Sequence, residues 1–489
     1  MTSLIPAPLR RALTMRQGEA EPALLSALAC FFVFSGWFVA RPVRDALGSI
    51  HDEHVLQRLF IFTLLGMALL NPVFSWCISR FPRRIFAPAA FLIFAANLLL
   101  FSALLASVHT STSLLWPSVF YVWSSVFNLF VISVFWALMA DLWGRESGKR
   151  LFGLIAVGGT LGALLAGLFT STYAKPLGVT TLLIIAALLM SSASLCVIRL
   201  NHLFTTRPSL RARDSLDSPD PAPQSDTPVS QGGAFGAFIS ISRSPALLAM
   251  SVYMIFFTST QTYVYFEQQR IVKAAFGDNL EARAAAFAQL DVYVQSTTVL
   301  LQLFGTSRIV RRLGIPASLA TLPLIFLAGA TALALAPTYT TLALFQVARR
   351  AGDYALARPA REAWYAGLAR ADKYKAKSFI DTFAYRAGDT LGAWALAPLK
   401  VSLLGPLLSL ALFTPITLAW AALTLCLRSG SKGSSPRRGR GGGCHRAAMT
   451  GEGSVLTPPP WWRRWFALRT GGGDCLPWRG RMSSRSDDR

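Results

Sequence analysis

The sequence SRFPRR at residues 79–84 returns as SRIVRR at residues 307–312, so the pattern R-x-x-R-R recurs at an offset of 228 residues (308 minus 80). Each copy follows the second apolar run of a series and precedes the third. Self-similarity at a fixed period indicates an internal repeat, although any short cytoplasmic turn between membrane helices also attracts arginine. The matched positions favour a duplicated protein over a series of unrelated helices.

Apolar runs of about 20 residues, the length that crosses a hydrocarbon core of roughly 30 Å, surround both copies of the pattern. We predict spans at 22–40, 59–79, 85–107, 114–140, 151–172, 177–198, 245–266, 286–306, 316–335, 338–357, 378–399 and 402–427. The predicted fold class is therefore all-α integral membrane, with 12 transmembrane helices in two six-helix halves, as in the parallel repeat of the major facilitator superfamily.

Polar segments divide the chain around these halves. We predict a cytoplasmic N-terminus at 1–21, an N-terminal half at 22–198, a cytoplasmic linker at 199–244, a C-terminal half at 245–427 and a disordered basic tail at 428–489. The linker and the tail have the Pro-, Ser-, Gly- and Arg-rich composition of segments that cannot bury enough apolar surface to fold.

The 489 residues are 53% apolar and only 15% charged, with a mean hydropathy of +0.45, so lipid is the implied solvent for most of the chain. The formal net charge of +23 lies in the tail and in alternate loops rather than in one basic patch. This distribution excludes nucleic acid as the expected partner. By the positive-inside bias it places both termini and the linker in the cytoplasm.

Enzymatic chemistry is not indicated. Six cysteines are scattered without metal or disulfide spacing. The glycine run at 153–167 is followed by no Walker lysine. We predict no enzyme, no cofactor and no metal site, and we expect the glycines to let helices pack closely.

Ionisable side chains at membrane depth cost roughly 3 kcal/mol each and normally face a cavity or one another. Span 1 ends with Arg41, Arg44 and Asp45, and its repeat partner, span 7, ends with Glu267 and Arg270. Snorkelling to the interface is the alternative interpretation for Arg41 and Arg270.

Span 11 contains four polar side chains within an apolar run: Asp381, Tyr385, Arg386 and Asp389. Spacings of three and four place Asp381, Tyr385 and Asp389 on one stripe of a helix, with Arg386 able to reach Asp389. A static ion pair between helices is the competing account, and a pair that breaks as the halves rock would serve both roles.

A basic cluster precedes this span, with Lys375 and Lys377 after the segment 358–362. Several cations held together bind a multiply charged anion well. The same charges are also typical of a cytoplasmic loop.

The segments 135–153 and 361–381 resemble the ATP/ADP translocase (nucleotide transporter) family, a divergent major facilitator branch. The resemblance covers roughly residues 22–427 and implies a bacterial inner-membrane protein. It implies that Arg44, Glu146, Glu267, Lys375, Lys377 and Asp381 line the nucleotide path. The chain departs from the family at Arg44, where a lysine is typical, and at 139–141, which replaces an amide-rich stretch.

We therefore predict a secondary active transporter that works by alternating access on an anionic solute, such as a nucleotide in ATP/ADP exchange or a phosphorylated metabolite. Arg44, Lys375, Lys377 and Arg386 would hold phosphate, and Glu146 and Glu267 would gate the empty site. One alternative is a proton-coupled exporter of a lipophilic compound, with Asp389 or Asp381 as proton carrier. Another is a transporter-like sensor or scaffold that recruits a partner through its linker or tail.

Overall fold

The computed structural model describes residues 16, 18–107, 114–207, 244–366, 380, 384–396 and 406–430. The predicted N-terminal residues 1–15, the linker residues 208–243 and the tail residues 431–489 lie outside this described part. All regular structure in the described ranges is helical, as the sequence predicts.

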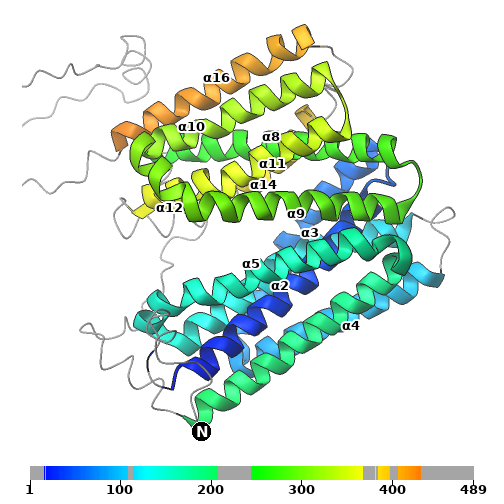
Figure 1. The fold of residues 1–489 in the computed structure, drawn as a ribbon, viewed down its shortest axis with the longest axis vertical. Helices are drawn as coiled ribbons and strands as arrows, with labels where there is room; N and C mark the ends of the chain where they lie inside the picture. The colour runs from blue at the N-terminus through cyan, green and yellow to red at the C-terminus, as the bar shows by residue number, and fades with distance from the viewer. Residues whose placement is uncertain are drawn as a thin grey trace, which may run out of the picture. The chain divides into compact units, whose positions relative to one another are not determined.

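The helices form two bundles within one compact unit (Figure 1). The first bundle contains α2 (Ala20–Gly48), α3 (Glu53–Arg80), α4 (Arg83–Ser107) and α5 (Leu115–Thr206). The second contains α8 (Pro245–Phe276), α9 (Leu280–Phe304), α10 (Thr306–Leu335), α11 (Tyr339–Gly352), η1 (Asp353–Ala357), α12 (Arg358–Ala366), α14 (Tyr385–Leu391), η3 (Gly392–Leu396) and α16 (Pro406–Gly430).

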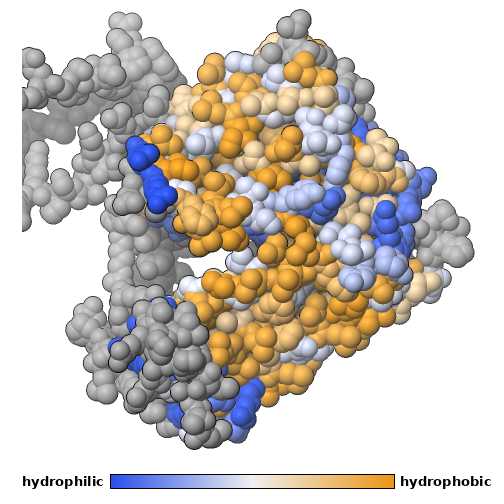
Figure 2. Space-filling model, viewed as in Figure 1, coloured by the Kyte–Doolittle hydropathy of each residue, from blue (hydrophilic) through white to orange (hydrophobic). Residues whose placement is uncertain are grey.

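Seven helices in the described ranges are long and apolar enough to cross a membrane. Large apolar side chains such as Leu69, Leu195 and Leu303 are exposed on the outside of the bundles, and Figure 2 shows apolar surface over both bundles. Such surface is stable against lipid tails but not against water. The chain is a multi-pass membrane protein.

The long helix α5 consists of three rods rather than one. At 1.5 Å per residue, a straight helix of 92 residues would extend about 140 Å, several times the thickness of a bilayer. The first rod, Leu115–Trp143, runs antiparallel to α2, because Trp143 Nε1 donates to Ser26 Oγ (3.0 Å) while Ser118 Oγ lies 3.3 Å from His51 Nε2.

The third rod begins after Gly178, whose φ of +78° interrupts the helical backbone. It runs antiparallel to α4, since Ser194 Oγ donates to the Pro88 carbonyl (3.0 Å) and Asn201 Nδ2 to the Arg84 carbonyl (2.9 Å). The three rods correspond to the predicted spans 114–140, 151–172 and 177–198.

Glycines bring the second rod of α5 against α2. A Cβ at Gly158 would lie 2.1 Å from the Ala27 carbonyl oxygen, and one at Gly162 would lie 2.4 Å from the Phe31 carbonyl oxygen. Both pairs have the same offset of 131 residues (158 minus 27, and 162 minus 31), so this rod runs parallel to α2. The predicted close packing is confirmed at these two glycines, whereas a Cβ at Gly153 would have no heavy atom within 4 Å.

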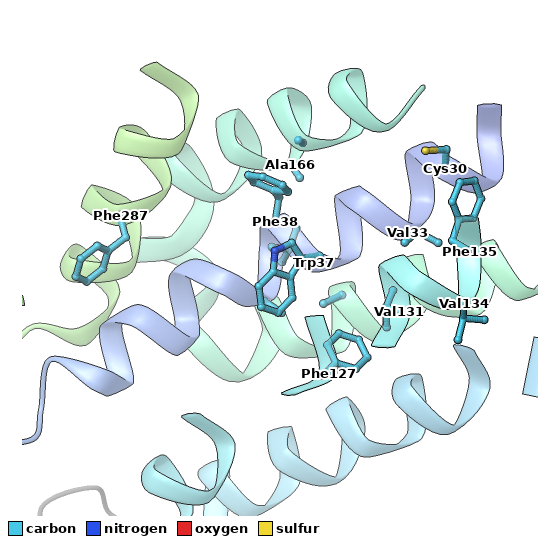
Figure 3. Packing of buried hydrophobic residues seen from close by; sticks show 14 of the residues in the cluster. Cys30, Val33, Trp37, Phe38, Phe127, Val131, Val134, Phe135, Ala166 and Phe287 are labelled. Atoms are coloured by element: carbon cyan, nitrogen blue, oxygen red, sulfur yellow. The ribbon is translucent and has the colours of Figure 1, made fainter. Parts of the chain in front are cut away.

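The centre of the first bundle is aromatic (Figure 3). Trp37 on α2 packs on Phe127 of α5, with ring centroids 6.1 Å apart, and Phe38 lies beside Ala166 of the second rod. Phe287 adds a side chain from α9 of the other bundle to the same apolar cluster. The core of this unit therefore continues across the boundary between the bundles.

The two copies of R-x-x-R-R have different conformations. In the first copy, Pro82 requires an extended residue before it, and Phe81 is extended between α3 and α4. The second copy has no proline, so its residues are helical at the start of α10 until Gly314, where φ is +77°. The prediction of two equivalent loops is wrong in this detail.

Two predicted boundaries are also wrong. The sequence predicts the first span at 22–40, but α2 continues through Pro42 to Gly48. The sequence predicts the tenth span at 338–357 with a loop after it, but the chain continues through the π turn η1 into α12. Pro359 lies in the first turn of α12, where a helix does not need its missing N–H.

The bundles meet near the α2–α3 and α8–α9 turns, which we call the closed end. There Arg283 of α9 donates to the Ser49 carbonyl (3.2 Å), and Lys273 of α8 donates to the Ile50 carbonyl (3.3 Å). Figure 2 shows a hollow between the bundles that opens on the left of the view, toward the side where α2 begins in Figure 1.

Candidate functional site

The buried aspartate Asp291 connects the two bundles. Asp291 on α9 pairs with Arg350 on α11 at 2.7 Å and with Arg41 on α2 at 3.3 Å. Its side chain is only 4% exposed. One carboxylate therefore partners two guanidinium groups, one from its own bundle and one from the other.

A second cluster lies at the same boundary and contains the predicted residue Arg44. Its Nε donates to Asp45 Oδ1 at 3.0 Å. Asp45 also accepts from the hydroxyl of Tyr265 on α8 (3.2 Å), which accepts in turn from the hydroxyl of Tyr121 (3.0 Å). The guanidinium lies 5.9 Å from the Trp37 ring centroid, so Arg44 is held by charge and aromatic contacts together.

Glu267 is fully buried in α8. It pairs with Arg270 at 2.7 Å and accepts a hydrogen bond from the Tyr263 hydroxyl at 3.1 Å. Arg270 thus binds a buried carboxylate instead of only reaching toward an interface.

The predicted contact within span 11 is confirmed. Arg386 Nη1 lies 2.9 Å from Asp389 Oδ2, and Asp389 Oδ1 accepts from Thr262 of α8 at 3.1 Å. Tyr385 accepts from Gln261 Nε2 at 3.1 Å. Tyr385 and Asp389 of the predicted stripe therefore pack against α8.

A further group of polar residues lies on α11, η1 and α12, and it joins Arg358 and Arg361 of the predicted basic segment 358–362 to Gln346, Arg349 and Asp353, which were not predicted. Arg358 lies 3.3 Å and Arg361 4.0 Å from the carboxylate of Asp353. Arg349 donates to Gln346 Oε1 at 2.8 Å. The same rule that selected spans 1, 7 and 11 applies here, because Arg349 and Asp353 stand inside a predicted apolar span.

Tyrosines lie between these clusters. The Tyr121 hydroxyl of the first bundle donates to Tyr265 of the second at 3.0 Å, and the Tyr265 hydroxyl donates back to Asp45 of the first at 3.2 Å. The clusters of both bundles therefore act within one polar region.

The remaining predicted site residues are not placed. Lys375, Lys377 and Asp381 lie outside the described residues. Glu146 lies on α5 in a stretch whose side chains are also outside the described part. Segment 358–362, expected as a loop, is helical, and Arg361 within it is buried against Met254 and Phe257.

No protein-family model and no curated protein matches this chain. Its structure is similar to that of a mutant of the nucleoside transporter NupG, with a TM-score of 0.59, 12% identity, and coverage of 84% of this chain and 98% of that one. It is also similar to a POT family transporter in complex with 5-aminolevulinic acid (TM-score 0.54, 13% identity, 83% of this chain and 96% of that one).

A third similar structure is a bacterial homologue of the human lysosomal transporter Spinster, inward-facing and unoccupied, with a TM-score of 0.52, 14% identity, and coverage of 84% of this chain and 95% of that one. At these identities the similarity concerns the fold, which is that of major facilitator-like membrane proteins. The ATP/ADP translocase branch is not distinguished by it.

Proposed function

We propose that this chain is a secondary active transporter that works by alternating access and that its cargo is an anionic solute, such as a nucleotide or another phosphorylated metabolite. The observation that carries the proposal is an excess of arginine over carboxylate in the polar region between the bundles. The clusters described above contain eight arginines against five carboxylates: Arg41, Arg44, Arg270, Arg349, Arg350, Arg358, Arg361 and Arg386 against Asp45, Glu267, Asp291, Asp353 and Asp389.

Burying an uncompensated charge is costly, so buried charges are normally paired. Here Asp45, Asp291 and Asp353 are each shared by two arginines, and a bound anion would supply the missing negative charge. Guanidinium groups suit this task because their planar fork matches carboxylate and phosphate oxygens and they stay charged.

The arrangement of the bundles supports alternating access. They are held together at the closed end, and a hollow separates them toward the other end. We propose that the closed end faces the outside of a bacterial inner membrane and that both termini are cytoplasmic, which makes this conformation inward-open. Three of the similar structures are transporters, one of them inward-facing.

Transport by the purified chain in liposomes tests the proposal. Vesicles loaded with a mixture of unlabelled nucleotides and sugar phosphates should take up radiolabelled anions by exchange. Arg44→Gln should reduce the uptake, because it removes a buried cation, whereas Arg207→Gln should not, because Arg207 lies on the surface in an ion pair with Glu21. Absence of anion uptake or exchange by folded, correctly inserted protein contradicts the anionic cargo.

The burial of Asp389 favours proton coupling as a second candidate. Its carboxylate is held by Arg386 and Thr262, and protonation would release Arg386. A proton-coupled exporter should lose flux driven by a pH gradient in Asp389→Asn. An anion exchanger should keep exchange between equal pH values in the same variant.

A further inference from the structure

We propose that Arg349, Arg358 and Arg361 form a subsite for a doubly charged oxyanion, and that Asp353 occupies this subsite as an internal counter-anion when the cargo is absent. The assignment of the oxyanion as part of the cargo rests on the proposed function. The subsite itself rests on the geometry of α11, η1 and α12.

The π turn explains why these side chains meet. In an α-helix, positions five apart lie on different faces, because each residue advances by about 100°. A π turn forms i→i+5 contacts, and η1 begins at Asp353, with the backbone N–H of Arg358 donating to the Asp353 carbonyl. The Arg358 side chain therefore returns over Asp353, with Nη2 3.3 Å from Oδ2.

The charges in this group do not balance. Arg358 and Arg361 pair with Asp353, and Arg349 lies one helical turn before it. Arg350 is already engaged by Asp291 at 2.7 Å. Arg361 reaches Asp353 only at 4.0 Å. Among the described residues, Asp353 Oδ1 and Arg349 Nε have no hydrogen-bond partner although both are buried. Two positive charges and a buried donor thus remain for a ligand.

Apolar side chains hold the arginines in place. The Arg358 guanidinium lies 4.6 Å from the ring centroid of Tyr354, and that of Arg361 lies 5.7 Å from the Phe257 centroid. Arg361 Nη1 also contacts Met254 Sδ at 3.4 Å. Because the rings exclude water, an oxyanion here would interact with the arginines more strongly than in bulk solvent.

Access to the subsite comes through Arg358. Its side chain is 54% exposed, while Asp353 and Arg361 are less than a tenth exposed. An anion can therefore meet Arg358 first and then displace Asp353 from the deeper arginine. Phosphate monoesters and dicarboxylates carry the required two charges.

The proposed role of Asp353 predicts the direction in which its substitution changes anion binding, and this direction differs from the one that a purely structural role predicts. If Asp353 competes with the ligand, Asp353→Asn should tighten anion binding. If Asp353 only stabilises the helix, the same variant should weaken binding or leave it unchanged.

Binding of inorganic phosphate, sulfate and acetate to the full chain in lipid nanodiscs tests this at pH 7.5, with calorimetry for affinity and thermal unfolding for folding. We expect phosphate and sulfate to bind more tightly than acetate. Arg349→Gln should raise the Kd for phosphate at least tenfold, which corresponds to about 1.4 kcal/mol, and Asp353→Asn should lower it. Arg308→Gln, an exposed arginine of the same bundle, should change nothing.

Arg358→Gln is a second variant that keeps the test valid if Arg349→Gln does not fold, since Arg358 is half-exposed. The proposal is overturned if the wild-type chain shows no preference for the doubly charged ions, or if Asp353→Asn weakens phosphate binding or leaves it unchanged. Phosphate binding with the expected pattern but no anion flux in liposomes would contradict the proposed function alone. Anion flux with an unchanged KM in Arg349→Gln would contradict the subsite alone.

Discussion

Replacing Arg41 by glutamine should open the closed end. Arg41 and Asp291 belong to different bundles and lie 3.3 Å apart. At an effective dielectric constant of about 20, two unit charges at this distance attract by about 5 kcal/mol. Most of this attraction is compensated when the closed end opens, because Asp291 keeps its contact with Arg350. Arg41 can also move from 3.8 Å into closer contact with Asp45.

A net contribution of about 1 to 2 kcal/mol remains, which corresponds to a five- to thirtyfold change in the ratio of closed to open molecules. Pulsed electron paramagnetic resonance can measure this ratio with spin labels at Asp52 and Ala275, two exposed positions of opposite bundles near the closed end. The labels require a background in which the six native cysteines are replaced.

Arg41→Gln should increase the population at the longer label distance by this factor. Arg207→Gln is the matched control, since it breaks an ion pair with Glu21 inside the first bundle. An unchanged distance distribution in Arg41→Gln, or the same change in both variants, would refute the assignment of this ion pair to the closed state.

Two further predictions concern stability. Gly158→Ala should destabilise the first bundle by about 1 to 3 kcal/mol, because its Cβ would meet the Ala27 carbonyl at 2.1 Å. Gly153→Ala, with open space around it, should stabilise the protein by up to about 1 kcal/mol. Thermal unfolding in detergent compares the two variants. Burial lowers the pKa of His51 in the α2–α3 turn, so the folded state binds fewer protons than the unfolded state and should lose stability as the pH falls through the ordinary histidine range. His51→Asn should make unfolding less dependent on pH between about 7 and 5, and an unchanged pH dependence would contradict this.

The sequence predicts the helical class and most spans because lipid imposes a simple rule, about 20 apolar residues per crossing. The rule does not locate helix ends that lie inside protein. The sequence predicts the end of span 1 at residue 40, because Arg41 and Pro42 interrupt the apolar run. Helix α2 nevertheless continues to Gly48, since Arg41 and Asp45 find partners in the other bundle. The π turn at Asp353 leaves no signal in hydropathy at all.

The sequence predicts site residues where a charge stands alone in an apolar run. It does not predict a contact whose second member comes from a distant segment. Arg386 and Asp389 are three residues apart, so their contact follows from helical geometry. Asp291 and Arg41 are 250 residues apart (291 minus 41), and only the packing of the bundles brings them together. The charged residues in spans 8 and 10 also stand inside apolar runs, so the rule that selected span 11 as a candidate site applies equally to them.

The distribution of partners around Asp291 suits a contact that must break repeatedly. A buried ion pair that loses one member leaves the other uncompensated, at a cost of roughly 3 to 5 kcal/mol. Here each member has a second partner in its own bundle, Arg350 for Asp291 and Asp45 for Arg41. The bundles can therefore separate at the closed end without leaving a bare charge on either face. The same principle holds at the proposed subsite, because the carboxylate of Asp353 replaces the anion whenever the anion leaves.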